Sequence, residues 1–201
     1  MWYTIIKEKV CRPTKSGEGT LFVLRGIEMG DYRYDKGEKI VYGTTGICLV
    51  EDIVGKKYPD KTTRMCYVLK PLSNNSATFF IPVDSQVILE KSRYIYTKDE
   101  IEEIFTSAAN KKMDWIDDKN VRATKFKEIL SNGVGEDFLQ MLACLYNRRI
   151  DVREMGKKIS NSDEIILRSA EDMIVEEVMY IFGSDEGTAM EYIKKKLGIS
   201  E

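Results

Sequence analysis

Residues 36–53 read KGEKIVYGTTGICLVEDI, and this stretch decides the fold of the first half of the chain. Two short apolar runs, residues 40–42 and 47–50, flank the connection Gly43-Thr44-Thr45-Gly46. β-branched and aromatic residues favour strands, and glycine supplies the positive φ angle that short hairpin loops require. The stretch therefore predicts a β-hairpin whose four-residue loop fixes the register of both strands.

Three further apolar runs follow the hairpin, at residues 64–69, 78–81 and 87–89, and a polar, charged loop at residues 55–63 precedes the first of them. Pro71 and Pro82 end the first two runs, because proline cannot donate a hydrogen bond to a neighbouring strand. Four or five short strands within about 55 residues are typical of a small, strongly curved barrel of the SH3 or Tudor kind.

The periodicity of the apolar residues changes at Thr97, where the sequence TKDE forms a capping box. Apolar residues then follow at helical spacing. Further helices are predicted at residues 117–131, around the apolar stripe of residues 138–146, from about residue 162, and at residues 185–197, with Gly198 in the C′ position. These stripes must pack on one another, so we expect a compact all-α domain.

The sequence thus predicts an α+β protein of two domains: a Tudor/SH3-like β-barrel at residues 29–93 and a compact all-α domain at residues 94–201. Residues 1–28 are treated as an extension that contains two strand-like runs, at 2–6 and 21–24. One hypothesis is that Met29 is the natural start of the protein, because the barrel pattern begins only after it.

Composition narrows the classes of function. The 201 residues include no histidine, which removes the usual general base and a common zinc ligand, so we expect no enzyme, no catalytic residue, no metal and no cofactor. The four cysteines form no C-x-x-C pair and are expected to be free thiols in a reducing compartment. No apolar run is long enough to cross a bilayer and no secretory signal is recognised, so a cytoplasmic protein without membrane contact is expected.

Trp115 lies between two predicted helices and has two interpretations. Composition alone favours a core tryptophan that closes the helical bundle, because tryptophan is usually well buried. The alternative is an exposed aromatic wedge, since apolar side chains inserted beside a base step from the minor groove hold distorted DNA.

Positive charge is concentrated around Trp115. Residues 111–127 carry six Lys and Arg against three Asp, although residues 94–201 together have a net charge of −6. Lys119, Arg122 and Lys125 are three apart and are expected near one helix face. This face is either simply solvated or binds phosphate. A second positive segment, which includes Arg148, Arg149 and Arg153, is given less weight because cations are favoured at a helix C-terminus in any case.

A second candidate surface is the strand at residues 78–81 together with Lys56 and Lys57. An edge strand has unpaired N–H and C=O groups and can recruit the strand of another protein. Phe79 or Phe80 would supply an apolar anchor, and because side chains alternate along a strand, one of the two must face the core. The alternative is that both are buried.

Several of these stretches together resemble the CarD family of bacterial transcription regulators. The barrel half contributes GEKIVYG (37–43), GIC (46–48), EDI (51–53), YVL (67–69) and FIPV (80–83), and the helical half contributes Trp115, Lys119, Arg122, FKEIL (126–130) and LY (145–146). The resemblance spans about residues 35–182. The same barrel occurs in the transcription-repair coupling factor, but no phosphate-binding loop of a helicase motor is present here.

The resemblance implies that the barrel docks on the RNA polymerase beta subunit and that the helical domain touches promoter DNA at the upstream edge of the melted bubble. In the family a tryptophan serves as the minor-groove wedge, and Trp115 is the matching position. The implied DNA-contacting residues are Trp115, Lys119, Arg122, Lys125 and Lys127. The implied polymerase-contacting residues are Lys56, Lys57, Thr78, Phe79, Phe80 and Ile81.

Two departures from the family pattern matter. Phe80 stands where some members have an arginine, and Ile116, Asp117 and Asp118 follow Trp115 where other members are basic. We therefore expect a monomeric, non-enzymatic factor that binds polymerase and stabilises the open promoter complex. The alternative is a protein–protein interaction module without DNA contact.

Overall fold

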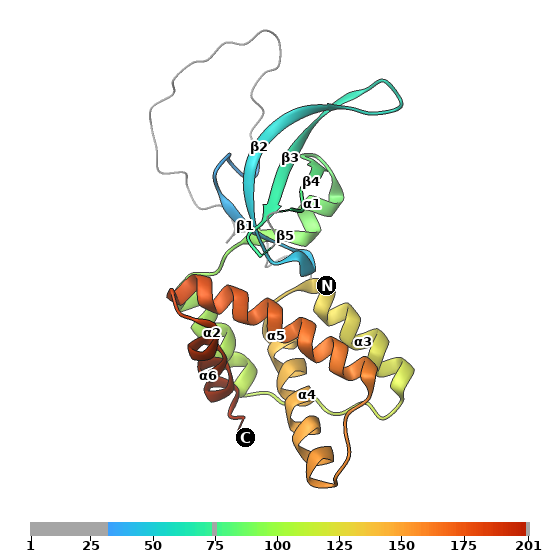
Figure 1. Cartoon of the computed structure of the whole chain (residues 1–201), viewed down its shortest axis with the longest axis vertical. Coiled ribbons are helices and arrows are strands. Elements are labelled where there is room, and N and C mark those ends of the chain that lie inside the picture. Colours follow the sequence, from blue (N-terminus) through green and yellow to red (C-terminus); the bar gives the residue numbers. More distant parts are fainter. Residues whose placement is uncertain (1–31, 74–75, 200–201) are drawn as a thin grey trace, which may run out of the picture. The chain divides into compact units, whose positions relative to one another are not determined.

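The structure is a computed structural model that describes residues 32–73 and 76–199. The predicted extension at residues 1–28, its two strand-like runs and Met29 lie outside the described residues. The described part of the chain is α+β. An antiparallel five-stranded sheet occupies its N-terminal part, and helices make up its C-terminal part (Figure 1).

The predicted hairpin is confirmed. Strand β1 (Lys39–Tyr42) pairs antiparallel with β2 (Ile47–Lys57), with Ile40 opposite Cys48. The connection is a 3₁₀ turn in which Gly43 and Gly46 have φ angles of +49° and +85°. The N–H of Tyr42 donates to the carbonyl of Gly46 at 2.9 Å and closes the loop.

The complete sheet has the order β4-β3-β2-β1-β5, with β3 at Thr63–Pro71, β4 at Phe79–Pro82 and β5 at Ser92–Tyr94. Every pairing is antiparallel. Among the described residues no pairing joins β4 to β5, so the sheet is not closed and β4 is an edge strand. The Tudor-like barrel stays a prediction.

The predicted fifth strand at residues 87–89 is wrong, because these residues belong to helix α1 (Gln86–Lys91). The Ser85 hydroxyl accepts a hydrogen bond from the Ile88 N–H at 3.3 Å and caps the helix. A run of three apolar residues is too short for its periodicity to separate a strand from one turn of helix. The fifth strand is instead β5, directly after this helix.

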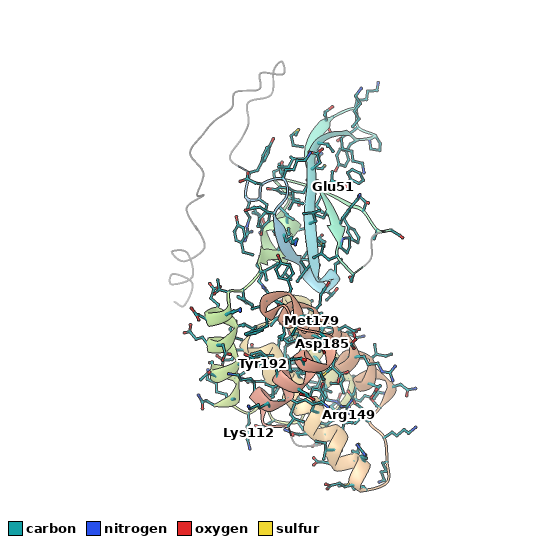
Figure 2. The ribbon with its side chains drawn as sticks, turned by 60° about the vertical axis from the view of Figure 1, so that its left-hand side comes forward. Glu51, Lys112, Arg149, Met179, Asp185 and Tyr192 are labelled. Carbon is teal, nitrogen blue, oxygen red and sulfur yellow. The ribbon has the colours of Figure 1, made fainter. Side chains whose placement is uncertain are left out.

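Strands β2 and β3 are longer than their apolar runs and form a ribbon (Figure 1). Their register shifts between Val50 and Asp52, so Glu51, labelled in Figure 2, is a bulged residue; its carboxylate pairs with Lys70. The outer part of this ribbon, residues 55–64, contains no buried residue. The polar loop proper is shorter than predicted and spans residues 58–62.

The predicted helices of the C-terminal part are confirmed, with small shifts of their ends. Helix α2 spans Lys98–Ala109, α3 Lys119–Asn132, α4 Glu136–Glu154, α5 Asn161–Phe182 and α6 Glu186–Leu197. The capping box of Thr97 and Glu100 is present at the start of α2. Asp118, Ser160 and Asp185 cap α3, α5 and α6, and Gly198 ends α6 in the left-handed conformation. No described helix is both long and apolar enough to cross a membrane.

Two apolar clusters form the core of the described residues. One lies on the sheet and includes Tyr34, Ile40, Tyr67 and Ile88. The other joins the helices α2 to α6 and contains the predicted stripe of α4, at residues 138, 141, 142, 145 and 146. The predicted domain boundary near residue 93 stays a prediction.

Candidate functional site

The β4 edge, residues 78–82, presents alternate side chains to opposite sides of the sheet, as the sequence predicted. Phe79 packs on the sheet core, with its ring centroid 6.3 Å from that of Tyr42. Phe80 points away from this core and is 41% exposed. Thr78 is exposed and Ile81 is half-buried against the sheet core. Of the two phenylalanines, Phe80 therefore offers the larger apolar surface to a partner.

The ribbon brings a cation to the same surface. Lys56 Nζ lies 4.1 Å from the centroid of the Phe80 ring, although the two residues belong to non-adjacent strands. Such an arrangement is attractive because the ring face is electron-rich. Lys57 is exposed in the same outer part of the ribbon. Four of the predicted polymerase-contacting residues, Lys56, Lys57, Thr78 and Phe80, are thus accessible, and Phe79 is used by the core.

Trp115 is half-buried in the segment between α2 and α3. Its ring packs edge to face on Phe126, with 6.4 Å between the ring centroids. Two guanidinium groups also lie over the indole: Arg122 Cζ is 4.2 Å and Arg148 Cζ is 5.0 Å from the ring centroid. The structure thus places Trp115 between the two predicted extremes, neither sealed in the core nor fully exposed.

Arg122 does not face solvent, which corrects the prediction of a cationic face shared with Lys119 and Lys125. The residue is only 5% exposed. Its guanidinium donates to both carboxylate oxygens of Asp163, at 3.1 and 3.0 Å, and to the carbonyls of Ile116 and Asp117, at 2.6 and 3.1 Å. These bonds fix the segment that carries Trp115 onto the start of α5.

Asp163 remains a carboxylate in this buried pair. Burial raises its pKa, but hydrogen bonds from Arg122 and from the Ser160 hydroxyl oppose this effect and leave the pKa below its ordinary value. A bidentate contact between guanidinium and carboxylate is strong and directional. The ion pair therefore holds α3 and the segment that carries Trp115 on the start of α5.

The other predicted DNA-contacting cations are exposed. Lys119, Lys125 and Lys127 all lie on the surface of α3, and Lys125 is 3.5 Å from the Glu128 carboxylate. The buried stripe of α3, formed by Arg122, Phe126 and Ile129, runs between Lys119 and Lys125. The cations therefore flank the stripe instead of forming one continuous face.

Sequence reasoning missed Arg148 as a neighbour of Trp115. Arg148 is half-buried on α4 and was attributed to a positive segment at a helix end. Its position one turn after Leu145, at the border of the apolar stripe, is the only signal that could have placed it beside the core. The contact with Trp115 comes from another helix and cannot be derived from spacing.

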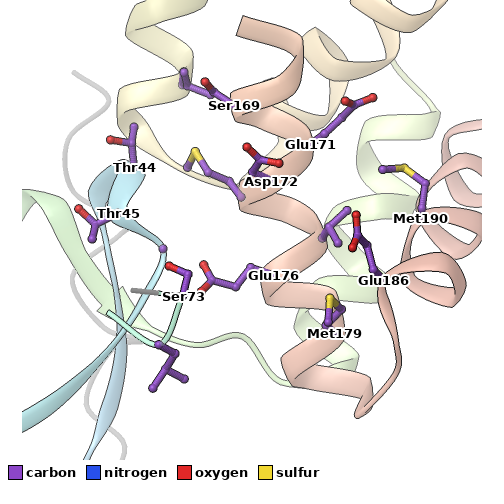
Figure 3. Close-up of a pocket in the computed structure, with 15 residues that line it drawn as sticks. Thr44, Thr45, Ser73, Ser169, Glu171, Asp172, Glu176, Met179, Glu186 and Met190 are labelled. Atoms are coloured by element: carbon purple, nitrogen blue, oxygen red, sulfur yellow. The ribbon is translucent and has the colours of Figure 1, made fainter. Parts of the chain in front are cut away.

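A cavity of about 870 Å³ lies elsewhere, between the 43–46 turn and α5 (Figure 3). Four carboxylates line it, those of Glu171, Asp172, Glu176 and Glu186. Glu176 accepts a hydrogen bond from the Ile47 N–H at 3.2 Å, and a Cβ at Gly46 would come within 1.9 Å of its carboxylate oxygen.

The neighbouring carboxylate of Glu177 has a different partner, Arg93, at 2.6 and 2.7 Å. Glu176 and Glu177 thus have different partners, because adjacent side chains on a helix point in different directions. Burial raises the pKa of Glu176, and the negative charge of Glu177 raises it further, against the opposing effect of the Ile47 N–H. Within the described part of the chain no group of three or more His, Cys, Asp or Glu could hold a metal ion.

Residues 34–92 match the family model of the CarD-like/TRCF RID domain. This segment contains β1 to β4, α1 and the first residue of β5, Ser92, and the match is consistent with a CarD-like RNA polymerase-interacting domain. The match confirms the predicted resemblance for the sheet part. The helices that carry Trp115, Arg122 and Arg148 lie outside the matched residues. No curated protein matched the chain.

Proposed function

We propose that this chain is a non-enzymatic transcription factor that binds the beta subunit of bacterial RNA polymerase through residues 34–92. The match of these residues to the CarD-like/TRCF RID domain carries the proposal. The β4 edge supports it, because an unpaired edge strand can add a strand of a partner. Phe80 supplies an exposed apolar anchor there, and Lys56 a charge beside it.

The second part of the proposal concerns the helical half. Trp115 contacts promoter DNA at the upstream edge of the melted bubble, and Lys119, Lys125 and Lys127 bind nearby phosphates. The support is the resemblance of this half to the CarD family, the exposure of the three lysines and the half-exposed indole. Arg122 is left out of the DNA contact, because its guanidinium is used inside the protein.

The two contacts would act together. When residues 34–92 are bound to polymerase, the effective concentration of the helical half at the promoter rises, so that weak DNA contacts become sufficient. A factor that binds the open complex better than the closed complex increases the population of the open complex. A single copy of the chain carries both contacts, which agrees with action as a monomer.

The polymerase contact is tested by measuring the affinity of the full chain for core RNA polymerase and for the isolated beta subunit. Phe80→Ala is expected to weaken binding about 5- to 150-fold, since truncating an apolar anchor removes on the order of 1–3 kcal/mol. Val87→Ala is the matched control, because Val87 is equally exposed but lies on α1. Equal affinity of wild type and both variants would contradict the proposed surface.

The alternative function is a protein–protein interaction module without DNA contact. The packing of Trp115 on Phe126 and two arginines favours this alternative, because such contacts are typical of a residue that stabilises the fold. The lifetime of open complexes formed with polymerase and a promoter separates the two functions. A Trp115→Ala protein that binds polymerase but no longer changes this lifetime supports the DNA contact, and one that acts like wild type supports the alternative.

A further inference from the structure

The two arginines over the Trp115 ring differ in how their charge is neutralised. The Arg122 side chain is 6% exposed and forms a two-pronged ion pair with Asp163, whose side chain is 2% exposed. Arg148 is half-buried, and the described residues place no carboxylate within ion-pair distance of it. One positive charge beside the indole is therefore balanced inside the protein, and the other is not.

The donors of the two guanidinium groups differ in the same way. Arg122 makes four hydrogen bonds, to Asp163 and to the Ile116 and Asp117 carbonyls, which use four of its five N–H donors. Arg148 contacts the Trp115 ring, with its Cζ 5.0 Å from the ring centroid. A contact with an aromatic ring does not pair the N–H donors of a guanidinium with oxygen acceptors, and the fork of these donors matches the oxygens of a phosphate.

The other arginines of α4 do not combine an unbalanced charge with a contact to Trp115. Arg149 lies over the Tyr146 ring and is 3.7 Å from the Glu171 carboxylate, so its charge is balanced. Arg153 is exposed on the last turn of the same helix and does not contact the indole. Arg148 thus combines a charge without a carboxylate partner with a position at Trp115.

We propose that Arg148 binds a DNA phosphate beside the base step that Trp115 contacts, and that Arg122 is a positioning residue that holds the indole in place. The inference rests on the proposed DNA contact of the helical half. It assigns the phosphate-binding role at the indole to a residue of α4, although Arg122 on α3 lies closer to the ring.

The test compares half-saturation concentrations for binding to a complex of RNA polymerase with a fluorescently labelled promoter duplex that contains an unpaired bubble. Each phosphate contact contributes about 0.9 to the slope of log affinity against log salt concentration. Salt weakens the phosphate contact of Arg148 in wild type, but the Arg148→Gln variant has no such contact to weaken. The ratio of the half-saturation concentration of Arg148→Gln to that of wild type should therefore fall about 3.5-fold between 50 and 200 mM KCl. The contribution of polymerase itself cancels in the ratio.

Arg153→Gln is the matched control, since it removes the same charge from the same helix without touching Trp115. Its ratio to wild type should stay constant with salt. If the Arg148→Gln ratio is also constant, or if both variants show the same fall, the assignment of Arg148 is overturned. If wild type and Trp115→Ala bind equally at every salt concentration, the proposed DNA contact itself fails.

The positioning role of Arg122 has a separate readout in the free protein. With Trp2 replaced by Phe, Trp115 is the only tryptophan, and acrylamide quenching reports its accessibility. Arg122→Lys and Asp163→Asn should each increase the quenching of Trp115, because neither preserves the two-pronged ion pair. Both variants should also raise the half-saturation concentration for binding to the polymerase–promoter complex, by a factor that does not depend on the salt concentration. Quenching equal to that of the parent in both variants would refute the positioning role.

Discussion

Replacement of Arg122 by Met is expected to destabilise the helical half strongly. The substitution keeps an apolar side chain of similar length but removes every donor that reaches Asp163. The Asp163 side chain is 2% exposed and would keep the Ser160 hydroxyl, at 2.7 Å, as its remaining side-chain donor. A buried carboxylate would thus lose its balancing charge.

The expected magnitude follows from burial. Removing one partner of a buried ion pair costs about 3–5 kcal/mol, because the other charge stays buried without compensation. An exposed pair is worth much less. Arg168 donates to Glu164 at 3.0 Å on the same helix as Asp163, but the Arg168 side chain is 72% exposed, and loss of such an i,i+4 pair costs about 0.3–0.5 kcal/mol. Arg168→Met is therefore the matched control.

The assay is urea unfolding followed by the fluorescence of Trp115 in the Trp2→Phe background and by helical circular dichroism. Coincidence of the two signals tests whether one free energy of unfolding describes the transition. Addition of Asp163→Asn to Arg122→Met should recover part of the lost free energy, because it removes the uncompensated charge. Equal free energies of unfolding for the Arg122 and Arg168 variants would refute the reasoning.

The stability that the Arg122–Asp163 ion pair contributes should depend on pH. The pKa of Asp163 is lowered in the folded protein, so its pairing contributes stability at pH values above the unfolded pKa of about 3.9. This contribution is lost as the pH falls through the lower, folded value. The difference between wild type and Arg122→Met should therefore shrink on acidification below about pH 4.

Three further predictions concern the sheet part and the cavity. In thermal unfolding, Gly46→Ala should destabilise the protein by at least about 1–3 kcal/mol, because alanine is strained at the positive φ angle of residue 46. The clash with the Glu176 carboxylate should add to this loss, and only this added part should be recovered when Glu176→Ala is combined with Gly46→Ala. Glu176→Gln should be more stable than wild type at pH 7, because the raised pKa of Glu176 means that stability falls as the carboxyl ionises. This advantage should disappear on acidification below the unfolded pKa of about 4.3, and a constant difference at all pH values would contradict the argument. Phe79→Ala should cost about 2–3 kcal/mol in denaturant unfolding and Phe80→Ala less than about 1 kcal/mol, and the reverse order would show that the two faces are misassigned.

The parts of the fold that the sequence predicted are those with local signals. The 43–46 turn follows from its glycines, and the start of α2 from the capping box of Thr97 and Glu100, because all the interacting groups lie within a few residues. Helix α1 was missed because its apolar run is short, and the Ser85 cap that determines it is a single residue.

The candidate site was predictable in composition but not in geometry. Alternation along β4 correctly implied that one of Phe79 and Phe80 faces the core. The role of Arg122 could not be derived, because its partner Asp163 is 41 residues away on another helix, and a count of charges does not show which charges meet. Arg148 was overlooked for the same reason, since its contact with Trp115 exists only after the helices have packed.

The outer part of the β2–β3 ribbon, residues 55–64, has one further consequence. It has no buried residue, whereas Cys66 and Leu69 further along β3 are fully buried. Segments with few buried contacts open locally at a smaller free energy than core strands, so its amide protons should exchange with deuterium first. The outer part of the ribbon, which carries Lys56 and Lys57, can therefore change its twist to follow the surface of a large partner while the buried part of the sheet keeps its shape.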